Sequence, residues 1–176
     1  GWPVQLISAL GTDPMGDRVL RLLAERGVGV DAIARFTQAR TGLLLIQVDA
    51  DGERHFHPWR ERAADLLMSP QALPEALIAG AALLHHGTVT LRGHPARSAT
   101  FRAAALARAS NVPVSVDVNL RPKMYSDPGA LRTQALAAVR GADVVKAAVE
   151  EAALLLGGAS SAQDLCQGLL QLGPSL

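Results

Sequence analysis

Short apolar runs alternate with segments of helical periodicity along most of the chain. The first apolar run, residues 4–8, predicts a buried strand. A turn over residues 11–14 follows, in which Asp13 is suited to cap a helix and Pro14 to occupy its first position. Apolar side chains then recur at helical spacing until Gly27, a residue typical of a helix end. These features predict one strand–turn–helix unit.

The next segment breaks this alternation. Residues 41–49 and 53–59 are both β-like, and the turn between them contains Asp51 and Gly52, which tolerate a positive φ. Because no helix separates these two strands, they cannot belong to a parallel layer. We therefore expect an antiparallel lid over residues 33–65, set apart from an α/β core formed by residues 1–32 and 66–176.

After the lid the alternation resumes. Strands are predicted over residues 81–86, 112–118 and 144–147, and helices over 70–79, 95–110, 128–139, 149–156 and 161–172. Repeated β-then-α order is typical of a parallel sheet covered by helices on both faces. Such sheets bind ligands beyond the carboxyl ends of their strands. This rule selects four segments, which are residues 11–16, 86–91, 117–123 and 146–151.

Composition narrows the classes of function. Of the 176 residues, 49% are apolar and 19% are charged, which provides a sizeable core and excludes a disordered chain. The net charge of +1 gives nucleic-acid binding no electrostatic support. The longest uncharged run, residues 76–91, is too short to span a membrane. The single cysteine, Cys166, is expected to be a small core residue and fits a reducing compartment such as the cytoplasm.

The most informative polar run follows the strand predicted over residues 112–118. Asp117, Asn119 and Arg121 would share one side of an extended chain. The planar guanidinium of Arg121 suits a phosphate or a carboxylate because it can donate two parallel hydrogen bonds. The alternative is a polar strand end that simply turns into a loop, and the residues alone do not separate the two interpretations.

Lys146 and the adjacent Glu150 and Glu151 follow the next predicted strand. A lysine can bind phosphate, and one or two carboxylates are enough for a magnesium ion that keeps most of its waters. The alternative needs no ligand, because acidic side chains in the first turn of a helix are favoured by the helix dipole. Spacing alone favours this structural alternative.

Two further segments carry groups that could contact a ligand. The adjacent His85 and His86 would face opposite sides of a strand, so they cannot chelate one metal ion together, whereas Gly87 and Thr88 offer close backbone approach and a hydroxyl. Arg60 follows a tryptophan on the lid and could cover a polar ligand or form a solvated rim. The chain contains no P-loop, Gly-x-Gly-x-x-Gly, Gly-x-Ser-x-Gly or zinc-binding spacing.

Taken in order, these segments resemble the ribokinase-like (PfkB) carbohydrate kinase family. Each piece is weak alone, but the ordered set is specific and runs through essentially the whole chain. It begins with a Gly-x-Asp-x-x-Gly turn at residues 11–16 and ends with residues 150–157. The pieces between are residues 27–31, Thr41, and residues 52–54, 59–65, 86–91, 95–98, 117–122 and 143–146.

The resemblance implies a three-layer α-β-α fold with a parallel-type sheet and a small antiparallel lid, of which this chain would hold a part. It implies a kinase that uses ATP and Mg²⁺ to phosphorylate a sugar hydroxyl. Arg60, Thr88 and Arg121 would then bind the sugar. Arg121 would also lie near the transferred phosphoryl group, with Asn119 and Lys146 serving phosphate or nucleotide. Glu151 would hold magnesium through water.

Two runs narrow the resemblance to fructokinases and 2-keto-3-deoxygluconate kinases. They are Arg-x-x-Ala-Ala-Asp at residues 60–65 and Asp-x-Asn-x-Arg at residues 117–121. Ala148 departs from the asparagine or serine that the family often has three residues before Glu151, which weakens the magnesium and nucleotide assignment. The lid carries Leu43, Leu44, His57 and Pro58 where the ketodeoxygluconate kinases commonly have tyrosines, so we favour fructose or a related hexose.

Two elements of the family are absent from the sequence. One is the N-terminal Gly-Gly-x-x-x-Asn element that binds sugar, and the other is the C-terminal Gly-Ala-Gly-Asp element that carries the catalytic base. We therefore expect a central segment of a kinase with no catalytic residue of its own, the base lying C-terminal to Leu176. The 176 residues should be inactive alone, and poorly stable or prone to association.

The resemblance also implies a homodimer joined through the lid in the full-length protein. A second hypothesis is therefore a non-catalytic module whose lid forms a subunit interface, because an exposed hairpin edge is a template for pairing. A third is a generic doubly wound nucleotide-binding domain, such as half of a dehydrogenase. The lack of a glycine-rich turn after residues 4–8 disfavours the third.

Overall fold

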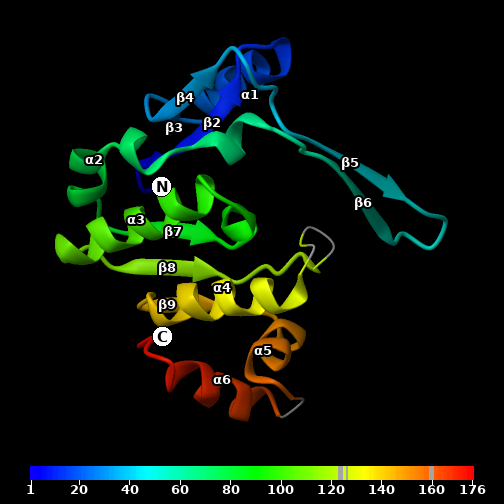
Figure 1. The fold of residues 1–176 in the computed structure, drawn as a ribbon, viewed down its shortest axis with the longest axis vertical. Helices are drawn as coiled ribbons and strands as arrows, with labels where there is room; N and C mark the ends of the chain where they lie inside the picture. The colour runs from blue at the N-terminus through cyan, green and yellow to red at the C-terminus, as the bar shows by residue number, and fades with distance from the viewer. Residues whose placement is uncertain (123–124, 126, 159–160) are drawn as a thin grey trace. The chain divides into compact units, whose positions relative to one another are not determined.

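The computed structural model describes the chain except for residues 123–124, 126 and 159–160 (Figure 1). It divides into two compact units, residues 1–68 and residues 69–176. Among the residues described, no helix is both long and apolar enough to cross a membrane.

The first unit begins with short strands paired in parallel. β1 (Val4–Gln5) pairs with β3 (Val28–Gly29), and β2 (Ser8–Gly11) pairs with β4 (Ile33–Phe36). The single strand predicted over residues 4–8 is therefore wrong, because it is two strands. Two residues separate β1 from β2, but three separate β3 from β4, so one continuous register cannot be kept and the pairing breaks.

Helix α1 (Pro14–Glu25) begins as the sequence predicts. Asp13 Oδ1 accepts a hydrogen bond from the Gly16 N–H at 2.8 Å, while Oδ2 accepts one from the Thr41 N–H at 2.7 Å. The backbone packs tightly here, since a Cβ on Gly16 would lie 2.3 Å from the carbonyl oxygen of Gly11. The turn therefore requires glycine at residue 16, and its capping carboxylate ties the start of α1 to the segment before the hairpin.

Strands β5 (Leu43–Val48) and β6 (Arg54–Trp59) form the predicted antiparallel hairpin, which projects as a two-stranded ribbon in Figure 1. Asp49 Oδ1 fixes the turn by accepting hydrogen bonds from the N–H groups of Asp51 and Glu53 at 3.0 and 2.9 Å. Every residue of both strands is exposed. Strand β4, which we placed within the lid range, instead pairs in parallel with β2.

The second unit contains a three-stranded parallel sheet. Its strands are β7 (Leu84–Gly87), β8 (Val114–Asp117) and β9 (Val144–Lys146), and β8 pairs in parallel with both neighbours. Figure 1 shows β7 and β8 side by side and pointing the same way. All three predicted strands are confirmed, with later starts for β7 and β8. Val114 and Val116 are fully buried, which anchors β8 in the interior.

The helices match the periodicity with one exception. Those confirmed are α3 (Ala96–Ala109), α4 (Pro128–Arg140), α5 (Val149–Leu156) and α6 (Ala162–Leu170). The helix predicted over residues 70–79 is instead a 3₁₀ turn, η2 (Pro70–Ala72), followed by α2 (Glu75–Ala79), because Pro74 lies between them and its ring interrupts a helix. Two further 3₁₀ turns are η1 (Ala64–Leu67) and η3 (Val89–Arg92).

Cys166 is exposed, so its predicted place in the core is wrong. The neighbouring Leu165 is the buried residue of α6, and adjacent residues on a helix point in different directions.

A buried cluster holds the segment that follows β8. It joins Val118 and Leu120 to residues of α4 and α5, namely Leu131, Ala135, Val139 and Leu155. The alternate residues are not buried, since Asn119 is half-buried and Arg121 is exposed. The core therefore anchors this segment by every second side chain and leaves the polar ones accessible.

Candidate functional site

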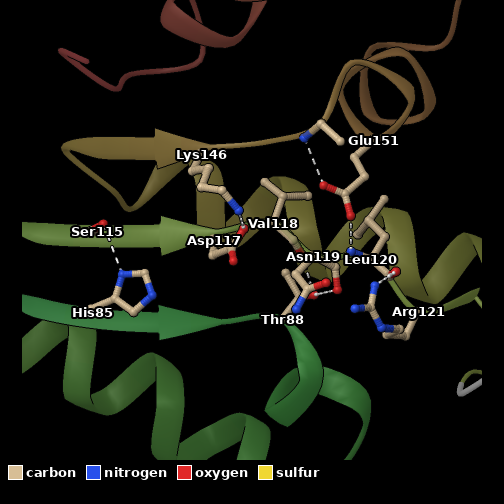
Figure 2. Close-up of polar contacts among 11 residues, drawn as sticks. His85, Thr88, Ser115, Asp117, Val118, Asn119, Leu120, Arg121, Lys146 and Glu151 are labelled. Carbon is tan, nitrogen blue, oxygen red and sulfur yellow. Dashed lines mark hydrogen bonds and ion pairs between the residues drawn. The ribbon is translucent and has the colours of Figure 1, made fainter. Parts of the chain in front are cut away.

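The carboxyl ends of β8 and β9 bring two charged side chains together (Figure 2). Asp117 and Lys146 are the last residues of their strands and face each other in the register. The Lys146 Nζ lies 3.1 Å from Asp117 Oδ1, and 80% of the lysine side chain is exposed. Exposed pairs of this kind contribute little to stability, so the ammonium can exchange its partner for an anion.

The segment beyond β8 turns sharply at Asn119, whose φ of 36° lies in the left-handed region. The Thr88 hydroxyl donates to the carbonyl oxygen of Val118 at 2.5 Å, and the carbonyl oxygen of Asn119 lies 3.3 Å from the same hydroxyl. On the other side, the Leu120 N–H donates to Glu151 Oε1 at 2.6 Å. Side chains from two other elements therefore hold the turn, as Figure 2 shows.

Glu151 lies in the first turn of α5, where its Oε2 accepts a hydrogen bond from the Ala148 N–H at 3.0 Å. Alanine has no side-chain oxygen with which to cap a helix, so Glu151 caps the start of α5. Each carboxylate oxygen accepts one of these hydrogen bonds and keeps a further lone pair. Glu151 therefore fits a magnesium ion that is held through its waters.

The described residues do not supply a complete metal site. Within residues 1–122, 125, 127–158 and 161–176, no group of three or more His, Cys, Asp or Glu could hold a metal ion. A magnesium ion whose waters are held by Glu151 would take its direct ligands from water and phosphate, as magnesium commonly does.

Thr88, which we predicted to bind sugar, is only 2% exposed, and its hydroxyl is bonded to the main chain. Its carbonyl oxygen accepts a hydrogen bond from the Tyr125 hydroxyl at 3.2 Å. Burial raises the pKa of Tyr125 above its ordinary value, so the hydroxyl keeps its proton. Motif reasoning missed Tyr125, because nothing in its spacing links it to Thr88.

Arg121 presents its guanidinium at the surface. Its Nη1 donates to the carbonyl oxygen of Leu120 at 2.9 Å, and no carboxylate of the described residues lies within ion-pair distance of it. The remaining donors can therefore bind an anion. Lys123, the last residue of the predicted segment 117–123, lies outside the described residues.

Arg60 belongs to the first unit and forms an ion pair with Asp65, and both side chains are about 20% exposed. The pairing joins the first and last residues of the Arg-x-x-Ala-Ala-Asp run. The two alanines between them, Ala63 and Ala64, are buried and fix the run in place. The ion pair therefore fixes the direction of the Arg60 guanidinium, whose other N–H donors remain available.

The adjacent histidines face opposite ways, as predicted. His85 is exposed and its Nδ1 lies 3.1 Å from the Ser115 Oγ. His86 lies inside, where burial lowers the pKa of its imidazole. His86 is therefore neutral near pH 7.

Comparison with known proteins finds a matching family, curated relatives and solved structures. The pfkB family carbohydrate kinase profile matches residues 1–174. Fructokinase-1 of Zea mays is 32% identical over 169 residues, which cover 96% of this chain and 52% of that protein. The PfkB protein of Polaromonas sp. JS666 has a TM-score of 0.92 at 27% identity, covering 99% of this chain and 59% of that chain. Fructokinase of Xylella fastidiosa, solved with bound ATP, has a TM-score of 0.85 at 32% identity, covering 97% and 53%.

The ribokinase-like α/β fold expected from the sequence is thus confirmed. The chain belongs to the pfkB family of carbohydrate kinases. It spans about half the length of the curated relatives that it matches.

Proposed function

We propose that the whole protein transfers the γ-phosphoryl group of ATP to a hydroxyl of fructose or a related sugar. The observation that carries this proposal is a pair of exposed cations at adjacent parallel strands, Arg121 on the segment after β8 and Lys146 at the end of β9. Phosphoryl transfer depends mainly on positioning and on stabilising the charge of the phosphate oxygens. The names of the fructokinases that the chain resembles support the same activity.

Each polar residue at this edge has a separate role in the proposal. Arg121 binds the sugar and the transferred phosphoryl group with the donors that Leu120 leaves unused. Lys146 exchanges Asp117 for a nucleotide phosphate, and the Asn119 amide binds phosphate beside it. Glu151 holds the waters of a magnesium ion, which when bound neutralises phosphate charge.

Arg60 binds the sugar in this proposal. Its ion pair with Asp65 holds the guanidinium in a fixed orientation, so its remaining donors can bind sugar hydroxyls. Thr88 supports the site from within the protein, because its hydroxyl is bonded to main-chain carbonyl oxygens.

The whole protein would be a cytoplasmic homodimer joined through the hairpin. One face of the hairpin carries only apolar side chains apart from Arg54 at its end, and these are Leu44, Ile46, Val48, Phe56 and Pro58. Between 46% and 59% of Leu44, Ile46, Val48 and Phe56 is exposed, which favours a partner surface. The single cysteine supports the reducing compartment.

The catalytic base lies outside these 176 residues in this proposal. A coupled assay of ADP release tests it, with fructose and 2-keto-3-deoxygluconate as separate acceptors. The whole protein should release ADP only with a sugar present, and kcat/KM should be higher for fructose. The 176-residue chain should release none above background. Sugar-dependent turnover by this chain would contradict the missing base, and a preference for ketodeoxygluconate would contradict the acceptor.

A further inference from the structure

We infer that Thr88 and Glu151 are positioning residues, which together lock the turn at Asn119 and so set the direction of Arg121. The kinetic part of this inference rests on the proposed sugar kinase activity. The structural part rests only on contacts within residues 69–176.

The turn at Asn119 needs outside support. Its φ of 36° is a conformation that a residue with a Cβ adopts rarely, and asparagine only reduces the penalty. Asn111, the other asparagine with positive φ among the described residues, follows the end of α3, where a left-handed residue is common. Asn119 instead follows a strand, so its conformation persists because its surroundings enforce it.

Thr88 fixes the peptide group that precedes Asn119. Of the polar and charged residues that the structure describes, Thr88 alone is buried. Its hydroxyl has one proton and donates it to the Val118 carbonyl oxygen at 2.5 Å. Tyr125 in turn donates to the Thr88 carbonyl oxygen. The Val118 N–H donates to the Lys146 carbonyl oxygen at 2.9 Å, so this stretch is held from two sides.

Glu151 fixes the peptide group that follows Asn119. Its Oε1 accepts the Leu120 N–H at 2.6 Å, a short distance typical of a bond to a charged acceptor. Its Oε2 accepts the Ala148 N–H, so the carboxylate bridges the turn and the start of α5.

Both dihedral angles of Asn119 are determined by these contacts. The angles φ and ψ describe how the two flanking peptide planes rotate about one Cα, and Thr88 holds one plane while Glu151 holds the other. Leu120 is 6% exposed and anchors the turn in the core. Arg121 follows directly and bonds to the Leu120 carbonyl oxygen. Losing either support would free the turn and misdirect the guanidinium.

Two matched pairs of variants in the whole protein test the kinetic part. Thr88→Val keeps the shape but removes the hydroxyl, whereas Thr88→Ser keeps it. We expect Thr88→Val to lower kcat about tenfold, with KM for fructose and ATP within about twofold, and Thr88→Ser to restore kcat. Glu151→Gln should also lower kcat, and excess magnesium should restore only part of the loss, because the bond to the Leu120 N–H is weakened whether or not the metal ion is bound. Glu151→Asp, whose shorter side chain cannot span both amides, should not rescue kcat.

A second readout does not depend on activity. In protein labelled with ¹⁵N-leucine, the Leu120 amide proton should be shifted downfield, and Glu151→Gln should move it upfield. Hydrogen exchange at Leu120 should become about tenfold faster in Glu151→Gln. This readout still tests the lock if the wild-type protein shows no kinase turnover, a result that would overturn only the proposed function.

Three results would overturn the inference. An unchanged Leu120 amide in Glu151→Gln would show that the bond does not hold the turn. A raised KM for sugar with wild-type kcat in Thr88→Val would make Thr88 a substrate contact. Full recovery of Glu151→Gln at high magnesium would assign Glu151 to the metal ion alone. If Thr88→Val does not fold, the Glu151 variants and the amide measurement decide.

Discussion

Asp13 connects two parts of the first unit through a single carboxylate. Two hydrogen bonds lower the pKa of Asp13 below its ordinary value. The one from the Thr41 N–H has the larger effect, and the one from the Gly16 N–H has the smaller. A carboxyl whose pKa is lower in the folded than in the unfolded state stabilises the fold above its unfolded pKa, about 3.9. That stabilisation is lost as the pH falls through the folded pKa.

We predict that Asp13→Ala lowers the free energy of unfolding by about 1–2 kcal/mol at pH 7, as loss of a helix cap does. Asp13→Asn keeps one acceptor and should cost less. Urea unfolding of the chain at pH 7 and at pH 3 measures both. The difference between wild type and Asp13→Ala should shrink at pH 3, and an equal difference at the two pH values would show that the carboxylate charge is irrelevant.

Replacing Arg60 and replacing Arg121 should change different kinetic constants. In the whole protein, Arg60→Ala should raise KM for sugar more than KM for ATP, because Arg60 is proposed to bind the sugar alone. Arg121→Ala should lower kcat, because a charge that stabilises the phosphoryl group in transfer is lost. Steady-state kinetics with each substrate varied measures both.

Arg21→Ala is the matched control for these variants, since Arg21 is exposed on α1 and has no proposed role. It should keep wild-type constants. Wild-type kinetics in Arg60→Ala or Arg121→Ala would remove that residue from the site.

At the scale of elements, local patterns predicted the type of most helices and strands. The sequence indicated the start of α1 because Asp13 and Pro14 mark a helix N-terminus. It also indicated the hairpin, since Asp51 and Gly52 form its turn. The pattern did not predict that residues 4–8 belong to two strands. The strand breaks there because two residues separate β1 from β2 but three separate their partners, β3 and β4.

The contacts of the candidate site could not be predicted in this way. Thr88 and Val118 are 30 residues apart, and Leu120 and Glu151 are 31 apart. The sequence identified Thr88 and Glu151 as polar residues at strand ends, which is a property of each segment. The hydrogen-bond partners of Thr88 and Glu151 depend on how β7, β8 and the start of α5 pack, so these contacts could be found only in the three-dimensional structure.

The apolar face of the hairpin leads to a prediction about assembly. In the whole protein, Ile46→Lys with Phe56→Lys should convert a dimer to a monomer, because the two residues face each other across β5 and β6. His57→Lys, on the opposite face, is the control and should leave the dimer intact. Light scattering gives the mass, and an unchanged mass in the double variant would argue against the hairpin as the interface.

At the scale of the whole molecule, family membership and the strand-end cations support one activity. The chain forms two compact units and spans about half the length of its curated relatives. In the proposed function these residues would position sugar and phosphate, and the base would come from another part of the whole protein.

Phosphoryl transfer itself is the central claim, and ³¹P NMR measures it directly. The whole protein with ATP, Mg²⁺ and fructose should give a phosphomonoester resonance of a sugar phosphate in an amount equal to the ADP formed, and Arg121→Ala should form both more slowly. Formation of ADP with inorganic phosphate and no sugar phosphate, or no reaction with any sugar, would contradict the account.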